Sequence, residues 1–459
     1  MKKLYILFIA LFFLGSCDML DFDDNINVSP NSPSQASGPQ LIANAMRYLP
    51  GLSASSTGEN GNFLAQYLSE TQYVVDSRYP EGGTSFYTYY QNPLINLETV
   101  LNTSTSDNQL AVAKILKAYF FWHVTDRWGD VPYSEALQGA DDFTPAYDTQ
   151  ESIYDNLFAL LDEADSQINE SVSLDSDIMY GGDMSQWKKF GNTVRLLMAL
   201  RLSEVNEEKA SAEFSNALDG GIMESNDDNF AYEHLSDASN QNYWYGQVSV
   251  QGREWWALSE TLVNVMEPVD DPRLPVYGDP ARTDGEFAGL PIGSEPAGEN
   301  TEDFSLLGET VRQQDSAVHL VTYAQALFAK AEAAELGWIT EDAETNYNEA
   351  VENSILQWTG STDDAAAFLA QAEIAYDGSI ERIATQRYVH LFLHGYEGWA
   401  EWRRTGYPDL VPSFGNDVPT RQSYTSDEAF NNTENYQAAV ERQFDGDNGL
   451  YGKIWWDAD

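Results

Sequence analysis

Hydrophobic residues recur at helical spacing along most of the 459-residue chain. In residues 150–168, for example, Ile153, Leu157 and Leu161 follow one another at intervals of four positions. This spacing places apolar side chains on one face of an amphipathic helix. The pattern therefore predicts a mainly α-helical fold. The same spacing occurs in residues 107–129 and 185–205.

The clearest pair of predicted helices lies in residues 318–358. Small residues, among them Ala326 and Ala333, lie on the first helix, Gly337 interrupts the pattern, and Tyr347 lies on the second helix. Small residues at a helix contact, a glycine turn and an aromatic residue on the returning helix are typical of a tetratricopeptide-like hairpin. Because no strict repeat period is present, we expect long insertions between such pairs.

Residues 220–316 have a different character from the rest of the chain. They are rich in glycine, proline, aspartate and aromatic residues and show no sustained periodicity. Long loops inside a compact domain are usually functional. We therefore expect this segment to be a ligand-binding loop region, inserted between helical repeats, with short strands at most.

The N-terminus has the features of an export signal. Lys2 and Lys3 precede an apolar run, residues 4–14, that is shorter than the ~20 residues of a membrane-spanning helix and fits a signal peptide. The run ends in Leu-Gly-Ser followed by Cys17, the only cysteine, which resembles a bacterial lipoprotein cleavage site. An ordinary secretory signal with an incidental cysteine is the alternative.

These features predict a simple domain organisation. We expect a signal peptide in residues 1–16, a lipidated Cys17 with a flexible linker in residues 17–38, and a single domain in residues 39–459. The linker is indicated by its serine, proline and asparagine content.

Charge restricts the partners of the protein. The chain has 24 lysine and arginine residues against 73 aspartate and glutamate residues, a formal net charge of −49. Nucleic acids and anionic lipid headgroups are bound by basic surfaces, so neither is an expected partner. A neutral or cationic ligand is easier to accommodate than an anionic one.

The sequence lacks the familiar local motifs of catalysis. No phosphate-binding loop and no nucleophile elbow is present. His390 and His394 lie one helical turn apart, but Leu391 occupies the position of the glutamate that a zinc protease requires. We therefore predict no catalytic residues, no metal site, no cofactor and no enzymatic activity. The many carboxylates leave a lipid-anchored glycoside hydrolase as an alternative.

Aromatic residues in loops are the best candidates for ligand contacts. Sugar rings present apolar C–H faces that pack on tyrosine and tryptophan rings, while neighbouring polar groups bind the hydroxyls. Two stretches, residues 72–90 and 239–247, combine such residues. The Trp255–Trp256 pair is instead expected at a helix start, packed in the core. The candidate ligand-binding residues are Trp244, Tyr245, Tyr243 and Asn242 in residues 239–247, and Tyr79 and Arg78 in residues 72–90.

Several longer stretches together resemble one known family. They include KAYFFWHVTDRWGDVPYSEAL (residues 117–137), VTYAQALFAKAEAAELGW (321–338), GYEGWAEWRRTGYPDLVP (395–412) and the terminal IWWD (454–457). In this order and spacing they are similar to the SusD/RagB family of outer-membrane lipoproteins of Bacteroidetes. The first stretch holds His123, Asp126 and Asp130, but its position at the end of a predicted helix indicates a structural corner rather than an active site.

The resemblance implies a fold and a function. The expected fold has about four tetratricopeptide-like helical pairs packed against a loop-rich ligand-binding half. The expected function is a lipid-anchored, surface-exposed outer-membrane protein that captures oligosaccharides or polysaccharides, with a neutral β-glucan preferred. It would act as the lid of a SusC-like TonB-dependent transporter, with the helical repeats facing the transporter. A RagB-like subunit for peptides or other nutrients is the alternative. The binding residues of this family follow no fixed pattern, so none is transferred.

Overall fold

A computed structural model describes residues 36–139, 142–294 and 300–458 of the chain. The predicted signal peptide, residues 1–16, and Cys17 lie outside the described residues, as does most of the predicted linker. The first described helix, α2, begins at Gly38.

Helices are by far the most common elements. The helices are α2 (Gly38–Met46), α3 (Asn60–Leu64), α4 (Tyr87–Tyr89), α5 (Ile95–Thr103), α6 (Asp107–Trp128), α7 (Gln150–Gln167), α8 (Met184–Arg201), α9 (Glu207–Gly220), α10 (Glu260–Met266), α11 (Leu274–Tyr277), α12 (Tyr323–Glu335), α13 (Ala343–Thr359), α14 (Ala365–Leu369), α15 (Ile380–His390), α16 (Gly395–Thr405), α17 (Ser426–Asn431) and α18 (Thr433–Phe444). The strands are β1 (Leu68–Glu70), β2 (Val131–Pro132), β3 (Tyr147–Asp148), β4 (Phe230–Tyr232), β5 (Trp256–Leu258) and β6 (Val318–Val321).

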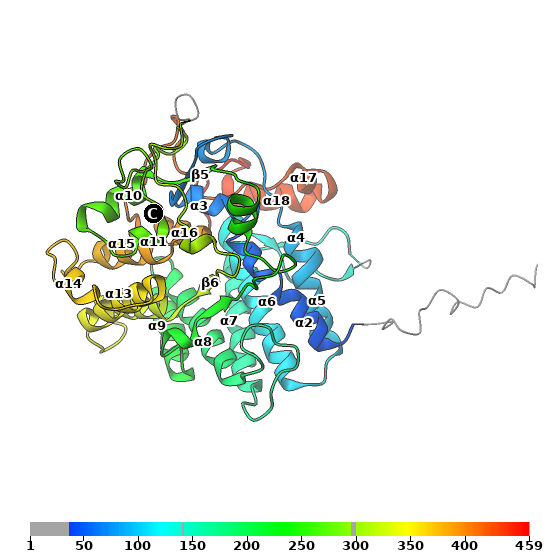
Figure 1. The fold of residues 1–459 in the computed structure, drawn as a ribbon. Coiled ribbons are helices and arrows are strands. Elements are labelled where there is room, and N and C mark those ends of the chain that lie inside the picture. The colour runs from blue at the N-terminus through cyan, green and yellow to red at the C-terminus, as the bar shows by residue number, and fades with distance from the viewer. Residues whose placement is uncertain (1–35, 140–141, 295–299, 459) are drawn as a thin grey trace, which may run out of the picture.

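Long helices that follow one another in the chain pack against each other as pairs. Extensive contacts join α6 to α7, α8 to α9 and α12 to α13, and α5 packs on both α2 and α6. The pairs then contact one another, because α7 touches α8 and α8 touches α12. In Figure 1 the labelled helices of these pairs extend across the molecule from α13 at the left to α2 and α5 at the right, while β5, α3 and α10 lie above them. The predicted helical fold is confirmed.

Helix α6 lies at the centre of this arrangement. Its apolar residues face every direction, and nearly all side chains from Ala111 to Trp128 are buried. A helix that is apolar all round is stable only when other elements cover all its faces. It ends at Gly129, whose φ of +81° is easily adopted only by glycine.

The residues at the end of α6 have structural roles. Arg127 donates from Nη1 to the hydroxyl of Tyr89 and from Nη2 to that of Tyr396, at 2.8 and 2.9 Å. Asp130 accepts a bond from the backbone N–H of Gln150 at 2.8 Å, at the start of α7. The interpretation of this stretch as a structural corner agrees with these contacts.

The strands form only two-stranded antiparallel sheets among the described residues: β1 with β5, β2 with β3, and β4 with β6. Between α9 and β6 the chain is mostly loop, with β4, β5, α10 and α11 as short elements. The expectation of short strands in this segment is therefore confirmed. Trp256 and its neighbours form strand β5 rather than the helix start that was predicted.

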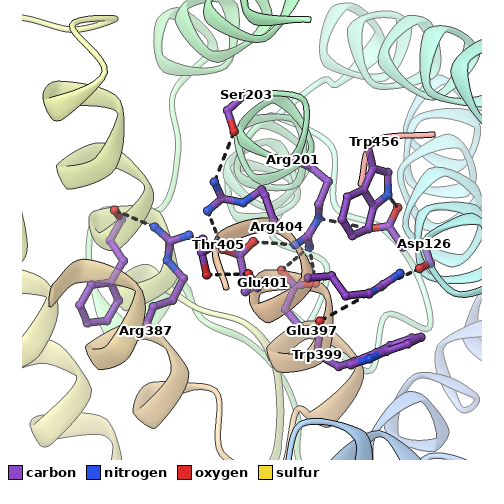
Figure 2. Close-up of polar contacts among 12 residues, drawn as sticks. Asp126, Arg201, Ser203, Arg387, Glu397, Trp399, Glu401, Arg404, Thr405 and Trp456 are labelled. Atoms are coloured by element: carbon purple, nitrogen blue, oxygen red, sulfur yellow. Dashed lines mark hydrogen bonds and ion pairs between the residues drawn. The ribbon is translucent and has the colours of Figure 1, made fainter. Parts of the chain in front are cut away.

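A buried network of ion pairs joins the helices from different parts of the chain (Figure 2). Arg201 of α8 contacts Asp126 of α6 at 3.2 Å, and Glu397 and Glu401 of α16 at 2.8 and 2.6 Å. Its side chain is 0% exposed. Glu401 also pairs with Arg387 of α15.

Glu332 of α12 completes the network. It pairs with Arg387 at 2.5 Å and with Arg404 of α16 at 2.6 Å. Arg404 also contacts Glu401 at 2.8 Å. The network thus couples the last helical pairs to α6 and α8, and each buried charge has an opposite charge beside it.

The arginines also set the protonation of the acids. Burial alone would raise the pKa of Glu401, but Arg404, Arg387 and Arg201 together hold it well below its usual range. Burial alone would also raise the pKa of Glu332, but Arg404 and Arg387 outweigh burial and lower this pKa below its usual value. Both carboxylates are therefore charged across the physiological range.

Replacing Glu401 by glutamine is expected to destabilise the fold strongly. The substitution keeps the shape of the side chain but leaves three buried guanidinium groups with one fewer negative charge. Breaking a buried ion pair from one side costs about 3–5 kcal/mol. We expect a loss of this size in the free energy of unfolding, measured by urea denaturation.

Glu163→Gln is the matched control. Glu163 pairs with Lys114 at 2.6 Å, but its side chain is 61% exposed. Such surface pairs contribute about 0–1 kcal/mol. Equal effects of the two substitutions would contradict a structural role for the buried network.

Candidate functional site

The short β1–β5 sheet positions two aromatic residues of the loop half, Tyr73 and Trp255. Glu70 pairs with Trp256 in the antiparallel register, and the pairing extends one step further, since the N–H of Thr71 donates to the carbonyl of Trp255 at 2.9 Å. Neighbouring side chains in a strand point to opposite faces. Trp256 is accordingly buried in the core, while Trp255 is only half-buried.

Tyr73, Trp255 and Arg253 form an open stack, which we term the platform. The ring of Tyr73 is 70% exposed and meets Trp255 edge-on, with centroids 5.1 Å apart. The guanidinium of Arg253 lies over the indole of Trp255, 4.2 Å from its centroid. Two aromatic surfaces and a cation are thus presented together at the surface.

The backbone at Tyr73 is strained. Its φ is +58°, in the left-handed region that non-glycine residues rarely adopt, at a cost of about 1–2 kcal/mol. Such strain persists where surrounding contacts impose it, and it gathers at functional sites. Here it accompanies an aromatic ring held out into solvent.

A pocket of about 380 Å³ adjoins the platform, and we term it the outer pocket. Arg253 lines this pocket and is also part of the platform. Arg282 binds Glu254 through two hydrogen bonds of 2.6 and 2.8 Å, and Arg312 pairs with Asp279 at 3.0 Å. These ion pairs hold fixed donors and acceptors around the pocket, as sugar hydroxyls require.

A second stack lies on the same segment of chain. The guanidinium of Arg78 lies 4.1 Å from the ring centroid of Phe414, which is 73% exposed. The Nε of Arg78 donates to the carbonyl of Gly293 at 2.8 Å, which fixes the side chain. Arg78, a predicted binding residue, is therefore placed at the surface beside an exposed ring.

Three other predicted residues are buried. Trp244 is 1% exposed and packs edge-on against Trp256, with centroids 5.4 Å apart. Tyr79 is 3% exposed, and its hydroxyl accepts a bond from Gln66 at 3.0 Å. The expectation that the rings of Trp244 and Tyr79 form an exposed stacking surface is wrong, because both fill the core. Asn242 is also buried, and its Oδ1 accepts from the N–H of Trp244 at 2.8 Å.

The remaining two candidates are half-buried. The hydroxyl of Tyr243 donates to Glu59 at 2.9 Å, and its ring packs on Trp244. Tyr245 begins the irregular helical turn Tyr245–Val250. Neither belongs to the platform, so their role in binding stays a prediction.

Sequence reasoning missed Tyr73 and Trp255, although it selected the segments around them. Tyr73 lies in the predicted stretch 72–90, and Trp255 was assigned to the core with its neighbour. Two consecutive tryptophans in a strand point to opposite faces, so one of them had to face outward. Recognising a strand instead of a helix start would have identified Trp255.

The described residues contain no group of three or more histidine, cysteine, aspartate or glutamate side chains that could hold a metal ion. No helix in the same part of the chain is long and apolar enough to cross a membrane. The platform and the outer pocket together have the features of a binding surface: aromatic rings, a neighbouring polar pocket and paired charges.

Comparison with known proteins places the chain in a family. Residues 30–425 match the profile of a SusD-like family described as "Starch-binding associating with outer membrane". The chain belongs to the SusD-like family. No curated protein sequence matches it significantly.

Solved structures of other proteins agree with this SusD-like assignment. A chitin-binding protein is 30% identical with a TM-score of 0.83, over 92% of this chain and all 100% of the other. A SusD homologue from Bacteroides fragilis is 26% identical with a TM-score of 0.82, over 92% and 99% of the two chains. A chitin-binding SusD homologue from Flavobacterium johnsoniae is 25% identical with a TM-score of 0.80, over 92% and 98%.

Two largely buried carboxyl groups, those of Glu59 and Glu70, make the free energy of unfolding of this SusD-like protein depend on pH. Burial raises the pKa of Glu59 and of Glu70 from 4.5 to about 7. Between these values the folded protein holds protons that the unfolded chain has released, so the free energy of unfolding falls as pH rises. Glu59→Gln removes one contribution. We expect the loss of stability from pH 5 to pH 7.5 to shrink by about 1–3 kcal/mol in urea denaturation.

Comparing the pH profile of Glu59→Gln with that of wild type separates the contribution of Glu59 from that of the buried histidines. Burial lowers the pKa of His319 and His394 to about 4, so their contribution is lost as pH falls, in the opposite direction. Both histidines are present in wild type and variant and cancel in the difference. Glu163→Gln, at an exposed site, serves as control, and an unchanged pH profile in Glu59→Gln would refute the assignment.

Proposed function

We propose that the protein is a glycan-binding lipoprotein of the outer membrane, which captures oligosaccharides or polysaccharides at the cell surface. The observation that carries the proposal is the platform, in which the exposed ring of Tyr73 meets the half-buried Trp255 and Arg253 lies over that indole. Membership of the SusD-like family and the chitin-binding relatives support it. The same family membership supports the absence of an enzymatic role.

The platform fits an extended sugar chain. The apolar faces of pyranose rings pack on Tyr73 and Trp255, while the hydroxyls bond to the arginines and carboxylates of the outer pocket. An open surface suits a polymer, because the chain can extend past the contact at both ends. Binding that exchanges rapidly would allow the ligand to be passed on.

A neutral, β-linked glycan is the proposed ligand class. The net charge of −49 disfavours polyanionic polymers. Two of the similar structures are chitin-binding, so chitin oligosaccharides are the first candidates, with a β-glucan second. The outer pocket itself is lined by three arginines and two carboxylates, and Arg282 and Arg312 are paired with Glu254 and Asp279.

The N-terminal sequence supplies the proposed anchor, and the family resemblance supplies the partner. Cys17 would carry the lipid that holds the protein on the outer surface of the membrane. A SusC-like TonB-dependent transporter is the proposed partner, with the protein acting as its lid during import. The helical pairs, which lie below β5 in Figure 1, offer a surface for that contact.

Removing either ring of the platform is expected to weaken glycan binding. A stacked aromatic contributes about 0.5–1.5 kcal/mol, so Tyr73→Ala and Trp255→Ala should each lower the association constant for chitin oligosaccharides by about 2- to 12-fold. Calorimetric titration with chitohexaose measures the constant. Affinity gels containing soluble chitin or β-glucan rank the polymers.

Phe430→Ala is the matched control, because Phe430 on α17 is 87% exposed and lies outside the platform. Its binding should equal that of wild type. Full binding by the Tyr73 and Trp255 variants would remove the platform from the proposal. Retention of peptides instead of glycans would favour a RagB-like role, and steady release of new reducing ends would favour a hydrolase.

Lipid attachment can be tested separately. Cys17→Ser removes the thiol that accepts the lipid, and we expect the variant to leave the membrane fraction and to incorporate no labelled fatty acid in a Bacteroidetes host. Wild type should carry the label. Membrane retention of the unlabelled variant would contradict anchoring through Cys17.

A further inference from the structure

A second cavity, of about 160 Å³, lies deeper in the loop half, and we term it the inner cavity. It shares no lining residue with the outer pocket. Thr310 is exposed and Gln357 is half-buried, so the cavity reaches the surface at this end, while the rings of Trp244 and Phe392 are buried at its base. The cavity is therefore partly open to solvent, with buried rings at its base.

The walls of the inner cavity are held in place by hydrogen bonds. Asn242 donates from its backbone to the carbonyl of Gln314 at 2.9 Å and from its side chain to that of Ser316 at 3.0 Å. The indole N–H of Trp358 donates to the carbonyl of His390 at 3.1 Å. A site whose walls are already fixed binds without the entropic cost of ordering them.

The lining is uncharged. It contains no aspartate, glutamate, lysine or arginine, although the chain carries 97 such residues, 24 basic and 73 acidic. Burial lowers the pKa of His319 to about 4, so its imidazole is neutral at physiological pH. Its Nδ1 is buried and has no hydrogen-bond partner among the described residues. An uncharged ligand with a hydroxyl or amide group matches this lining.

Size and shape narrow the ligand to a single ring. A closed cavity of about 150 Å³ accommodates one benzene-sized molecule, so in this partly open cavity one sugar ring fits with its substituents directed toward the solvent. The indoles of Trp244 and Trp358 and the ring of Phe392 offer apolar faces. Gln357, Thr310 and the Nδ1 of His319 offer donors and acceptors, whereas the side chain of Asn242 is already bonded within the protein. Aromatic faces together with a few polar groups are the features of a sugar site.

Packed aromatic rings connect the inner cavity to the platform. Trp244 contacts Trp256 with centroids 5.4 Å apart, Trp256 contacts Trp255 at 5.7 Å, and Trp255 contacts Tyr73. The two sites are thus distinct surfaces of one aromatic cluster. A ligand in the inner cavity would touch Trp244, which is three ring contacts away from Tyr73.

We propose that the inner cavity is a second binding site, which takes one uncharged pyranose ring. The sugar class rests on the proposed function, whereas the size and neutrality of the ligand follow from the cavity alone. The exposed platform holds a polymer along its length, and the inner cavity holds a single sugar unit.

Nuclear magnetic resonance of the histidine rings tests this proposal in the full folded chain. The chain has 5 histidines, and the ring C–H signals of His319 are assigned by their loss in His319→Gln. D-glucose and N-acetyl-D-glucosamine are the probes. We expect a saturable shift of the His319 signals, with the signals of His234, which does not line the cavity, unchanged. No shift of His319 with either sugar would overturn the proposal.

Two variants separate the sites. Ala317 lines the inner cavity and is half-buried, so Ala317→Phe should fill the space and abolish the His319 shift while leaving polymer binding intact. Tyr73→Ala should do the reverse. A shift that persists in Ala317→Phe, or that disappears in Tyr73→Ala, would place the monosaccharide elsewhere. If Ala317→Phe does not fold, the response of His319 in wild type and in Tyr73→Ala decides.

Failure of this inference is distinguishable from failure of the proposed function. Polymer binding that depends on Tyr73, without any response of His319, would leave the platform in place and reject the inner cavity. A response of His319 without polymer binding would do the opposite.

Discussion

The buried ion pairs around α16 are the constraint on which the rest of the structure depends. Four basic and four acidic side chains, drawn from α6, α8, α12, α15 and α16, are removed from water at this point. Buried charges are tolerated only when each has a partner in good geometry, so the helices that carry them have one permitted arrangement. The eight side chains are Arg201, Arg387, Arg403 and Arg404 with Asp126, Glu332, Glu397 and Glu401.

Arg403 extends this constraint to the end of the chain. Its guanidinium is stacked between the indoles of Trp399 and Trp456, 3.8 and 4.6 Å from their centroids. Its Nη2 donates to the backbone carbonyl of Asp126 at 2.8 Å, while Trp456 donates to the Asp126 carboxylate at the same distance. The C-terminal tryptophan is thereby held against α6, the central helix.

The same helix transmits the constraint to the binding surface. Helix α16 packs on α3 so closely that a Cβ added at Gly395 would lie 2.1 Å from the carbonyl carbon of Gly61. Helix α3 leads directly into β1, and β1 pairs with β5 to set Tyr73 over Trp255. The scaffold therefore fixes the base of the platform, while its side chains lie on the loops next to β1 and β5. This division explains how one fold can present different binding surfaces.

The sequence predicted the scaffold much better than the site, for physical reasons. Helical periodicity is local, so the pairs α6–α7 and α12–α13 could be predicted from spacing alone. The exposure of a loop ring depends instead on contacts with distant segments. Trp244 and Trp255 look alike in sequence, and only the pairing of β5 with β1 turns Trp255 outward and leaves Trp244 beneath Trp256. The left-handed backbone at Tyr73 has no sequence signal, because tyrosine does not favour it.

A structure of the protein with chitohexaose bound tests the central claim most directly, namely that the glycan lies on the platform. The account predicts sugar rings packed against Tyr73 and Trp255, with hydroxyls reaching the arginines of the outer pocket. A glycan bound to the helical pairs, with the rings of Tyr73 and Trp255 left uncovered, would contradict it.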